Sequence, residues 1–189
     1  MGEPKLLLPW RDTTVIGWII RQWQQLGAQQ MAAVCRADDS PLHAELDRLQ
    51  HPRADRIINP DPSRGMFSSI QCAANWNGWP PALTHFAIAL GDQPQLATET
   101  LTAIIESATH SPSRICQPLH TGRAQHPILL PRVIFGELKN TAHHTMKEFL
   151  AARKDELNLV EINDSGVAMD IDTPEDYRAI AKRFGGKGD

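Results

Sequence analysis

The chain has 189 residues, of which 41% are hydrophobic and 22% are charged, and its formal net charge is −3. This length allows one domain with a substantial core, and the composition is typical of a soluble globular protein. The slightly acidic balance argues against broad nucleic-acid binding, and no apolar run reaches the roughly 20 residues of a membrane helix.

The cysteines point to no special chemistry. Cys35, Cys72 and Cys116 are odd in number and far apart, and none lies in a Cys-x-x-Cys pair. We therefore expect free thiols rather than a zinc site or a disulfide framework. The apolar run at residues 6–8 is too short for a signal peptide, so we expect a cytoplasmic protein.

Apolar spacing, capping residues and turn residues predict helices that alternate with strands. Thr13 or Thr14 is the expected cap of the first helix, and Ser40 that of the second. The closing strands are expected to form a hairpin about residues 164–166. In chain order, the expected elements are helix 13–26, strand 31–35, helix 40–49, strand 56–58, helix 63–76, strand 85–90, helix 97–108, strands 114–119 and 127–130, helices 131–138 and 141–153, strands 157–162 and 167–171, and helix 174–184.

This alternation predicts an α/β domain over residues 1–184 with helices on both faces of a mostly parallel sheet. The closer spacing of strands in the last third predicts a small antiparallel part. Residues 185–189 are expected to form a flexible tail.

Two of the predicted strands end at carboxylates. Gly91 and Asp92 follow the apolar run at residues 86–90, and Asp170 and Asp172 end the run at 167–171. In an open α/β sheet, ligands bind at the carboxyl ends of the strands. Two carboxylates brought together there repel each other unless a cation lies between them, and Mg²⁺ bound to nucleotide phosphates is a common cation of that kind. The pattern therefore predicts nucleotide chemistry.

Each carboxylate also has a purely structural alternative. Asp92 can cap the following helix, although Pro94 makes that role less natural. Strand alternation places Asp170 and Asp172 on the same side. Asp172 or Thr173 can cap the helix that begins at Pro174, so both a ligand role and a capping role stay open for Asp172.

Three further segments are weaker candidates. Gly65, Ser68 and Ser69 lie at a turn that opens a helix, where backbone N–H groups and hydroxyls can bind an anion or a sugar, but Ser63 can also be a simple N-cap there. The turn at Gly122 precedes His126 and Pro127 and can be a substrate loop or ordinary surface. The adjacent pair at 143–144 is not spaced for a shared metal on one helix face.

The order of these motifs resembles a known family. The motifs are Gly2-x-x-Lys5-Leu-Leu-Leu-Pro9, Asn59-Pro-x-x-x-x-Gly65-Met-x-Ser-Ser69-Ile, Leu90-Gly-Asp-Gln-Pro94, Gly122-x-x-x-His126-Pro127 and Asp170-Ile-Asp-Thr-Pro-Glu-Asp176. In this order they resemble the MobA-like NTP transferases, and within them the molybdenum cofactor (molybdopterin) cytidylyltransferases. The resemblance covers residues 1–184.

The resemblance implies a Rossmann-like, three-layer nucleotidyltransferase fold. It implies Mg²⁺-dependent transfer of a nucleoside monophosphate from CTP or GTP to molybdopterin, with CMP from CTP as the first choice, and service to a molybdoenzyme as a further possibility. Lys5 would lie at the nucleotide phosphates, and Asp92 and Asp172 would be the metal ligands. Gly65, Ser68 and Ser69 would lie by the nucleotide, and Gly122, His126 and Pro127 would contact the second substrate. Such chemistry needs positioning and charge neutralisation rather than a nucleophilic side chain.

The sequence departs from the family pattern in three places. The first strand and its glycine-rich phosphate loop have no counterpart before Met1-Gly2, so we expect either a gap between the neighbouring strands or a new pairing of them, and poor catalysis by the chain as written. Gln125 and the segment at 141–144 also differ from the pattern, which bears on acceptor recognition. The competing hypotheses are a protein that binds a nucleotide or the finished cofactor without turnover, and a transferase acting on a sugar phosphate or sugar acid.

Overall fold

A computed structural model describes residues 4–186 of the protein. Met1, Gly2 and Glu3, which include part of the first motif, and the end of the expected tail at 187–189 lie outside the described residues. Within the described part the α-helices are α1 (Val15–Gln25), α2 (Ser40–Arg48), α3 (Met66–Asn75), α4 (Thr98–His110), α5 (Arg132–Glu137), α6 (Met146–Ala151) and α7 (Pro174–Phe184). The strands are β1 (Pro9–Trp10), β2 (Thr13–Thr14), β3 (Ala33–Cys35), β4 (Arg56–Ile58), β5 (His85–Ile88), β6 (Ile115–His120), β7 (Arg123–Ala124), β8 (Ile128–Pro131) and β9 (Leu157–Glu161).

The larger sheet is mixed. Its strands follow the order β5-β8-β6-β7, and β9 pairs with β6. β6 and β9 are parallel, whereas β8 is antiparallel to both β5 and β6. The antiparallel part is larger than the sequence predicted because only a short loop separates β6 from β8, and a parallel pairing needs a longer crossover.

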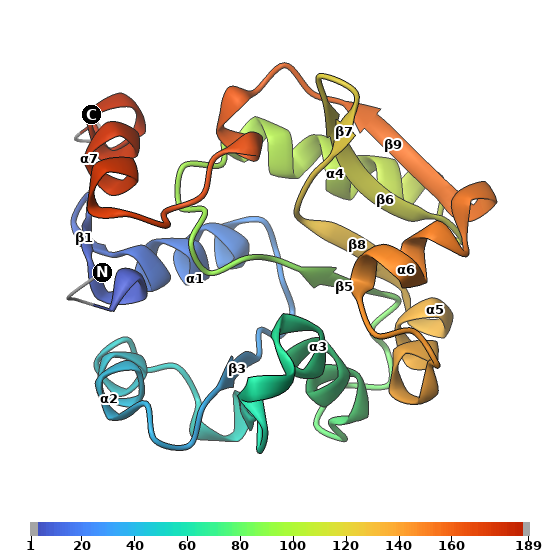
Figure 1. The fold of residues 1–189 in the computed structure, drawn as a ribbon, viewed down its shortest axis with the longest axis horizontal. Helices are drawn as coiled ribbons and strands as arrows, with labels where there is room; N and C mark the ends of the chain where they lie inside the picture. Colours follow the sequence, from blue (N-terminus) through green and yellow to red (C-terminus); the bar gives the residue numbers. More distant parts are fainter. Residues whose placement is uncertain (1–3, 187–189) are drawn as a thin grey trace.

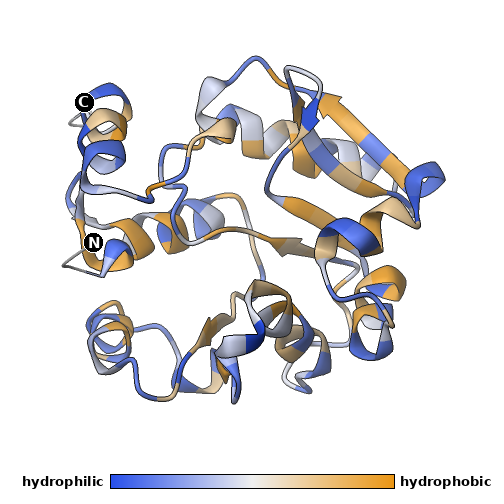
Figure 2. Cartoon of the chain, in the orientation of Figure 1, coloured by the Kyte–Doolittle hydropathy of each residue, from blue (hydrophilic) through white to orange (hydrophobic). Residues whose placement is uncertain are grey.

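Helices cover both faces of this sheet, as the three-layer fold requires (Figure 1). On one face Ile115, Ile128 and Leu130 pack with residues of α3, α5 and α6. On the other face Cys116 and Leu129 pack with Ile104 of α4. Successive residues of β8 therefore enter opposite cores, which explains the hydrophobic run of this strand in Figure 2. The expected α/β, Rossmann-like architecture is confirmed.

The sheet is divided between β3 and β5. β3 pairs in parallel with β4 in a separate two-stranded sheet, and within residues 4–186 no strand pairs with the second edge of β3 or of β5. Ala87 of β5 and the following Ala89 are exposed, although the centre of such a sheet is normally buried on both faces. Of the two outcomes expected from the sequence, a gap or a new pairing, the described residues show the gap, since β3 and β5 do not pair with each other.

The predicted strand at residues 167–171 and its hairpin are wrong. Residues Ser165–Ala168 form a 3-10 helix instead, and β9 pairs with β6 rather than with this segment. The Gln95 amide donates to the carbonyls of Gly166 and Met169, at 2.9 and 2.5 Å. The Asp164 carboxylate accepts from Gly166 N and Thr100 Oγ1. These side chains form hydrogen bonds with the backbone carbonyl and N–H groups that would otherwise pair between the strands of a hairpin.

Several predicted helix boundaries shift as well. Thr14 caps α1 as expected, but Asp39 rather than Ser40 caps α2. The helix expected at 141–153 begins only at Met146, because the Thr145 side chain accepts a hydrogen bond from Glu148 N and so fixes the N-terminus there.

Candidate active site

Three elements from distant parts of the chain bring charged side chains to one place. Lys5 lies in the 3-10 helix η1 (Lys5–Leu7), Asp92 follows β5, and Asp172 precedes α7. Ile171 N donates to Asp92 O across 3.3 Å, which holds the segment before α7, with Asp172, beside the end of β5. The placement agrees with the rule that the carboxyl ends of strands collect functional groups.

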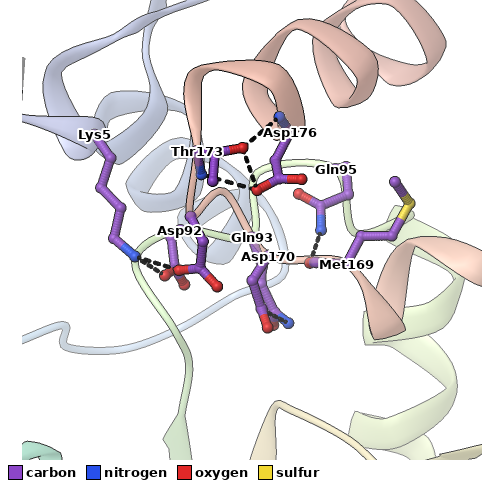
Figure 3. A network of polar contacts seen from close by, with 9 residues as sticks. Lys5, Asp92, Gln93, Gln95, Met169, Asp170, Thr173 and Asp176 are labelled. Carbon is purple, nitrogen blue, oxygen red and sulfur yellow. Dashed lines mark hydrogen bonds and ion pairs between the residues drawn. The ribbon is translucent and has the colours of Figure 1, made fainter. Parts of the chain in front are cut away.

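The Lys5 ammonium bridges the two carboxylates. It donates to Asp92 Oδ2 in a close ion pair (Figure 3). It also donates to Asp172 Oδ1 at 3.4 Å. The Asp92 side chain is 17% exposed and that of Asp172 is 71% exposed, so Asp92 lies deeper and Asp172 lies at the surface. Burial by itself would lower the pKa of Lys5, but the contacts with Asp92 and Asp172 outweigh it and raise that pKa, so the amine is charged.

The capping alternative for Asp172 is resolved. Thr173 is the N-cap of α7, and its hydroxyl accepts from Asp176 N while the Asp176 carboxylate accepts from Thr173 N. This capping box leaves the Asp172 carboxylate free to face Lys5. Asp92 is likewise no helix cap, since α4 begins only at Thr98.

Asp170 has a different environment from Asp172, contrary to the strand alternation expected for the pair. Its Oδ1 accepts from Gln93 Nε2 at 2.8 Å, and Figure 3 shows these two side chains together, apart from Lys5. The change follows from the loss of the strand at 167–171, because side-chain alternation no longer applies to residues 170–172.

The segment at Gly65, Ser68 and Ser69 forms a turn held by one buried amide. Asn59 Nδ2 donates to Ser68 Oγ at 2.8 Å and to Ser69 Oγ at 3.0 Å. Ser68 Oγ also donates to Gly65 O at 2.7 Å, which satisfies its hydroxyl inside the protein. Gly65, with φ of +82°, is the N-cap of α3, so Ser63 is not the cap. Of the two serines, Ser69 keeps a hydroxyl proton for a ligand.

The remaining candidates, Gly122, His126 and Pro127, follow β6 but lie in different surroundings. Gly122, with φ of +75°, lies in the exposed turn between β6 and β7. His126 and buried Pro127 precede β8, nearer the carboxylates. Burial lowers the pKa of His126, and the nearby charges of Asp170 and Asp92 oppose that shift. The structure thus brings His126 near the acidic groups and leaves Gly122 at the surface.

Two side chains that organise the site had no role assigned from sequence. Gln93 and Gln95 are buried, and their amides hold Asp170 and the 3-10 helix Ser165–Ala168 in place. Asn59 opens one of the family motifs but had no role of its own there, yet it donates to both serines. Amides in a turn that follows an apolar strand were the available signal, since buried amides must find hydrogen-bond partners.

The donor set suits a divalent cation that also binds its substrate. Within residues 4–186 no three His, Cys, Asp or Glu side chains group to enclose a metal ion. Two carboxylates do converge on one cationic group, the Lys5 ammonium. Mg²⁺ and similar hard ions take one or two carboxylates and complete their coordination with water and phosphate oxygens. The residues therefore fit a metal ion that arrives with a phosphorylated ligand.

The family model described as the MobA-like NTP transferase domain matches residues 1–157. The chain belongs to this family of nucleotidyltransferases. It is 26% identical over 187 residues to the molybdenum cofactor cytidylyltransferase of Escherichia coli (strain K12), covering 97% of this chain and 90% of that protein.

Solved structures agree with this assignment. Rv0371c from Mycobacterium tuberculosis H37Rv is 28% identical, with a TM-score of 0.75 over 96% of this chain and 90% of that one. Its complex with manganese is 27% identical, with a TM-score of 0.71 over 96% and 93% of the two chains.

In this MobA-like protein, no helix of residues 4–186 is both long enough and apolar enough to span a bilayer.

Proposed function

We propose that this MobA-like protein transfers CMP from CTP to the phosphate of molybdopterin with the help of a divalent cation, Mg²⁺ in the cell. The observation that carries the proposal is the convergence of Asp92 and Asp172 on one positive charge. The cytidylyltransferase relative supports the choice of CTP and of the molybdenum cofactor, and the manganese complex of a second relative supports the divalent ion.

In the proposed reaction, a phosphate oxygen of molybdopterin forms a bond to the α-phosphorus of CTP. The bond from that phosphorus to the oxygen bridging the β-phosphate breaks, and pyrophosphate leaves. Asp92 and Asp172 would hold the cation, which neutralises phosphate charge, while Lys5 would bind the phosphates directly. Gly65, Ser68 and Ser69 would position the nucleoside, with Ser69 as the donor, and His126 and Pro127 would face the pterin.

The test is a transfer assay with purified protein, molybdopterin, Mg²⁺ and either CTP or GTP, followed by chromatography of the dinucleotide product. We expect CMP transfer that depends on Mg²⁺ and falls at least about 100-fold in Asp92→Asn, since charge neutralisation supplies most of the catalysis. Exclusive GMP transfer would contradict the choice of nucleotide. Transfer at an undiminished rate in Asp92→Asn would contradict the role of the carboxylates.

The division of the sheet between β3 and β5 favours a second candidate function. A protein with this gap beside its site can hold a nucleotide or the finished cofactor for a molybdoenzyme without turning it over. Tight, Mg²⁺-dependent binding of CTP or of the dinucleotide cofactor, with no pyrophosphate released, would select this alternative.

A further inference from the structure

Lys5 occupies the place between the carboxylates that a divalent cation would need. One ammonium contacts both Asp92 and Asp172, and within residues 4–186 neither carboxylate forms an ion pair with another cation. A divalent ion coordinated by the same oxygens would lie beside a like charge. The ammonium must therefore leave these oxygens when the metal ion binds them.

The side chain of Lys5 can move while its backbone stays fixed. Leu6 and Leu7 pack in a core with Cys35, Leu42 and Leu46, which anchors η1. A Cβ at Gly91 would lie only 3.0 Å from Leu6 Cδ2, so η1 fits closely against the loop that carries Asp92. The Lys5 side chain is 35% exposed, and its four-carbon stem has several rotatable bonds. An ammonium released from Asp92 thus stays close to the site.

We propose that Lys5 is an exchangeable counter-ion that couples metal binding to nucleotide binding. Without ligands its ammonium neutralises Asp92 and Asp172 and competes with divalent ions. When the metal ion enters with a nucleotide, the ammonium moves from the carboxylates to the phosphates. The nucleotide thereby removes the competitor, and each ligand strengthens binding of the other by the same factor. This inference rests on the proposed function, because it assigns a further role to a residue of the same site.

The test is a Mn²⁺ titration followed by electron paramagnetic resonance, with Mn²⁺ alone and then with CTP present. In Lys5→Met we expect Mn²⁺ alone to bind about tenfold more tightly than in the wild type, because an opposing cation has been removed. The enhancement of Mn²⁺ binding by CTP should shrink by a similar factor, because the phosphates have lost their lysine. Lys5→Ala should show the same two changes.

The control variants separate the lysine exchange from the metal site itself. Lys147→Met on α6 removes an exposed lysine of the same chemistry and should leave both titrations unchanged. Asp92→Asn should weaken Mn²⁺ binding severely. If Asp92→Asn does so but Lys5→Met and Lys5→Ala leave the affinity for Mn²⁺ alone unchanged or weaker, the exchange is refuted and the proposed function stands. If Asp92→Asn leaves Mn²⁺ binding unchanged, the metal site fails, and with it both proposals.

Discussion

Mild acid should destabilise the fold through two histidines that burial keeps neutral. Burial lowers the pKa of His51, a residue of the core, and it lowers the pKa of His126 next to the site. The unfolded chain then binds protons more readily than the folded chain. The stability associated with these residues is present above the ordinary histidine pKa and is lost as the pH falls below it.

The size of the effect follows from proton linkage. A histidine that stays neutral when folded and has a pKa of about 6.5 when unfolded costs the folded state about 1.4 kcal/mol between about pH 7.5 and pH 5.5. Two such residues set an upper limit of about 2.7 kcal/mol. Asp47 does not contribute in this range, because hydrogen bonds from Arg53 and Arg56 lower its pKa to about 2 and its titration lies in stronger acid.

Urea unfolding followed by tryptophan fluorescence across this pH range, with a chelator present, measures the effect. We expect the free energy of unfolding to fall with pH in the wild type, and to fall by up to about 1.4 kcal/mol less in His51→Gln or in His126→Gln. His144→Gln, at an exposed position, is the matched control. Wild-type stability that rises toward pH 5.5, or variants with the full pH dependence, would refute the reasoning.

Two further predictions concern the cap beside the site and the divided sheet. Thr173→Ala should cost about 1 kcal/mol of stability through the lost cap of α7, and should also weaken Mn²⁺ binding because Asp172 adjoins that cap. Thr145→Ala removes the cap of α6 at a similar cost but should leave Mn²⁺ binding alone, so equal effects of both on Mn²⁺ would contradict the placement of Asp172. In hydrogen exchange, peptides covering β3 and β5 should exchange faster than β6, which has paired neighbours on both sides. Equal protection of all three strands would contradict the division of the sheet.

The sequence predicted the position of Asp92 well because a short apolar strand, a glycine and a proline leave few alternatives. The three layers followed from the alternation of strands and helices for the same reason. Both are local patterns that a buried strand imposes on its own residues. The strand expected at 167–171 had a similar apolar pattern, but the buried amide of Gln95 donates to the carbonyls of Gly166 and Met169. That contact joins distant segments, so it leaves no local pattern.

The choice between Asp170 and Asp172 depended on one local contact and on two that join distant segments. Asp172 faces Lys5 because Thr173 and Asp176 complete the capping box by themselves, and Asp170 turns toward Gln93. The sequence alone left the capping role open, since either residue 172 or 173 was acceptable as a cap. For Lys5 the sequence offered no physical signal beyond its place in the family motif, because a single lysine is usually a solvated surface charge.

A crystal of the protein grown with Mn²⁺ and CTP, with the ion located by its anomalous scattering, tests the central claim most directly. We predict one Mn²⁺ peak within about 2.0–2.3 Å of a carboxylate oxygen of both Asp92 and Asp172 and of phosphate oxygens of CTP, with the Lys5 ammonium displaced onto the phosphates. A peak bound by Asp92 and Asp170 would transfer the second ligand role to Asp170. A peak remote from Asp92, or Asp92 and Asp172 still bridged by Lys5 beside bound Mn²⁺·CTP, would contradict the account.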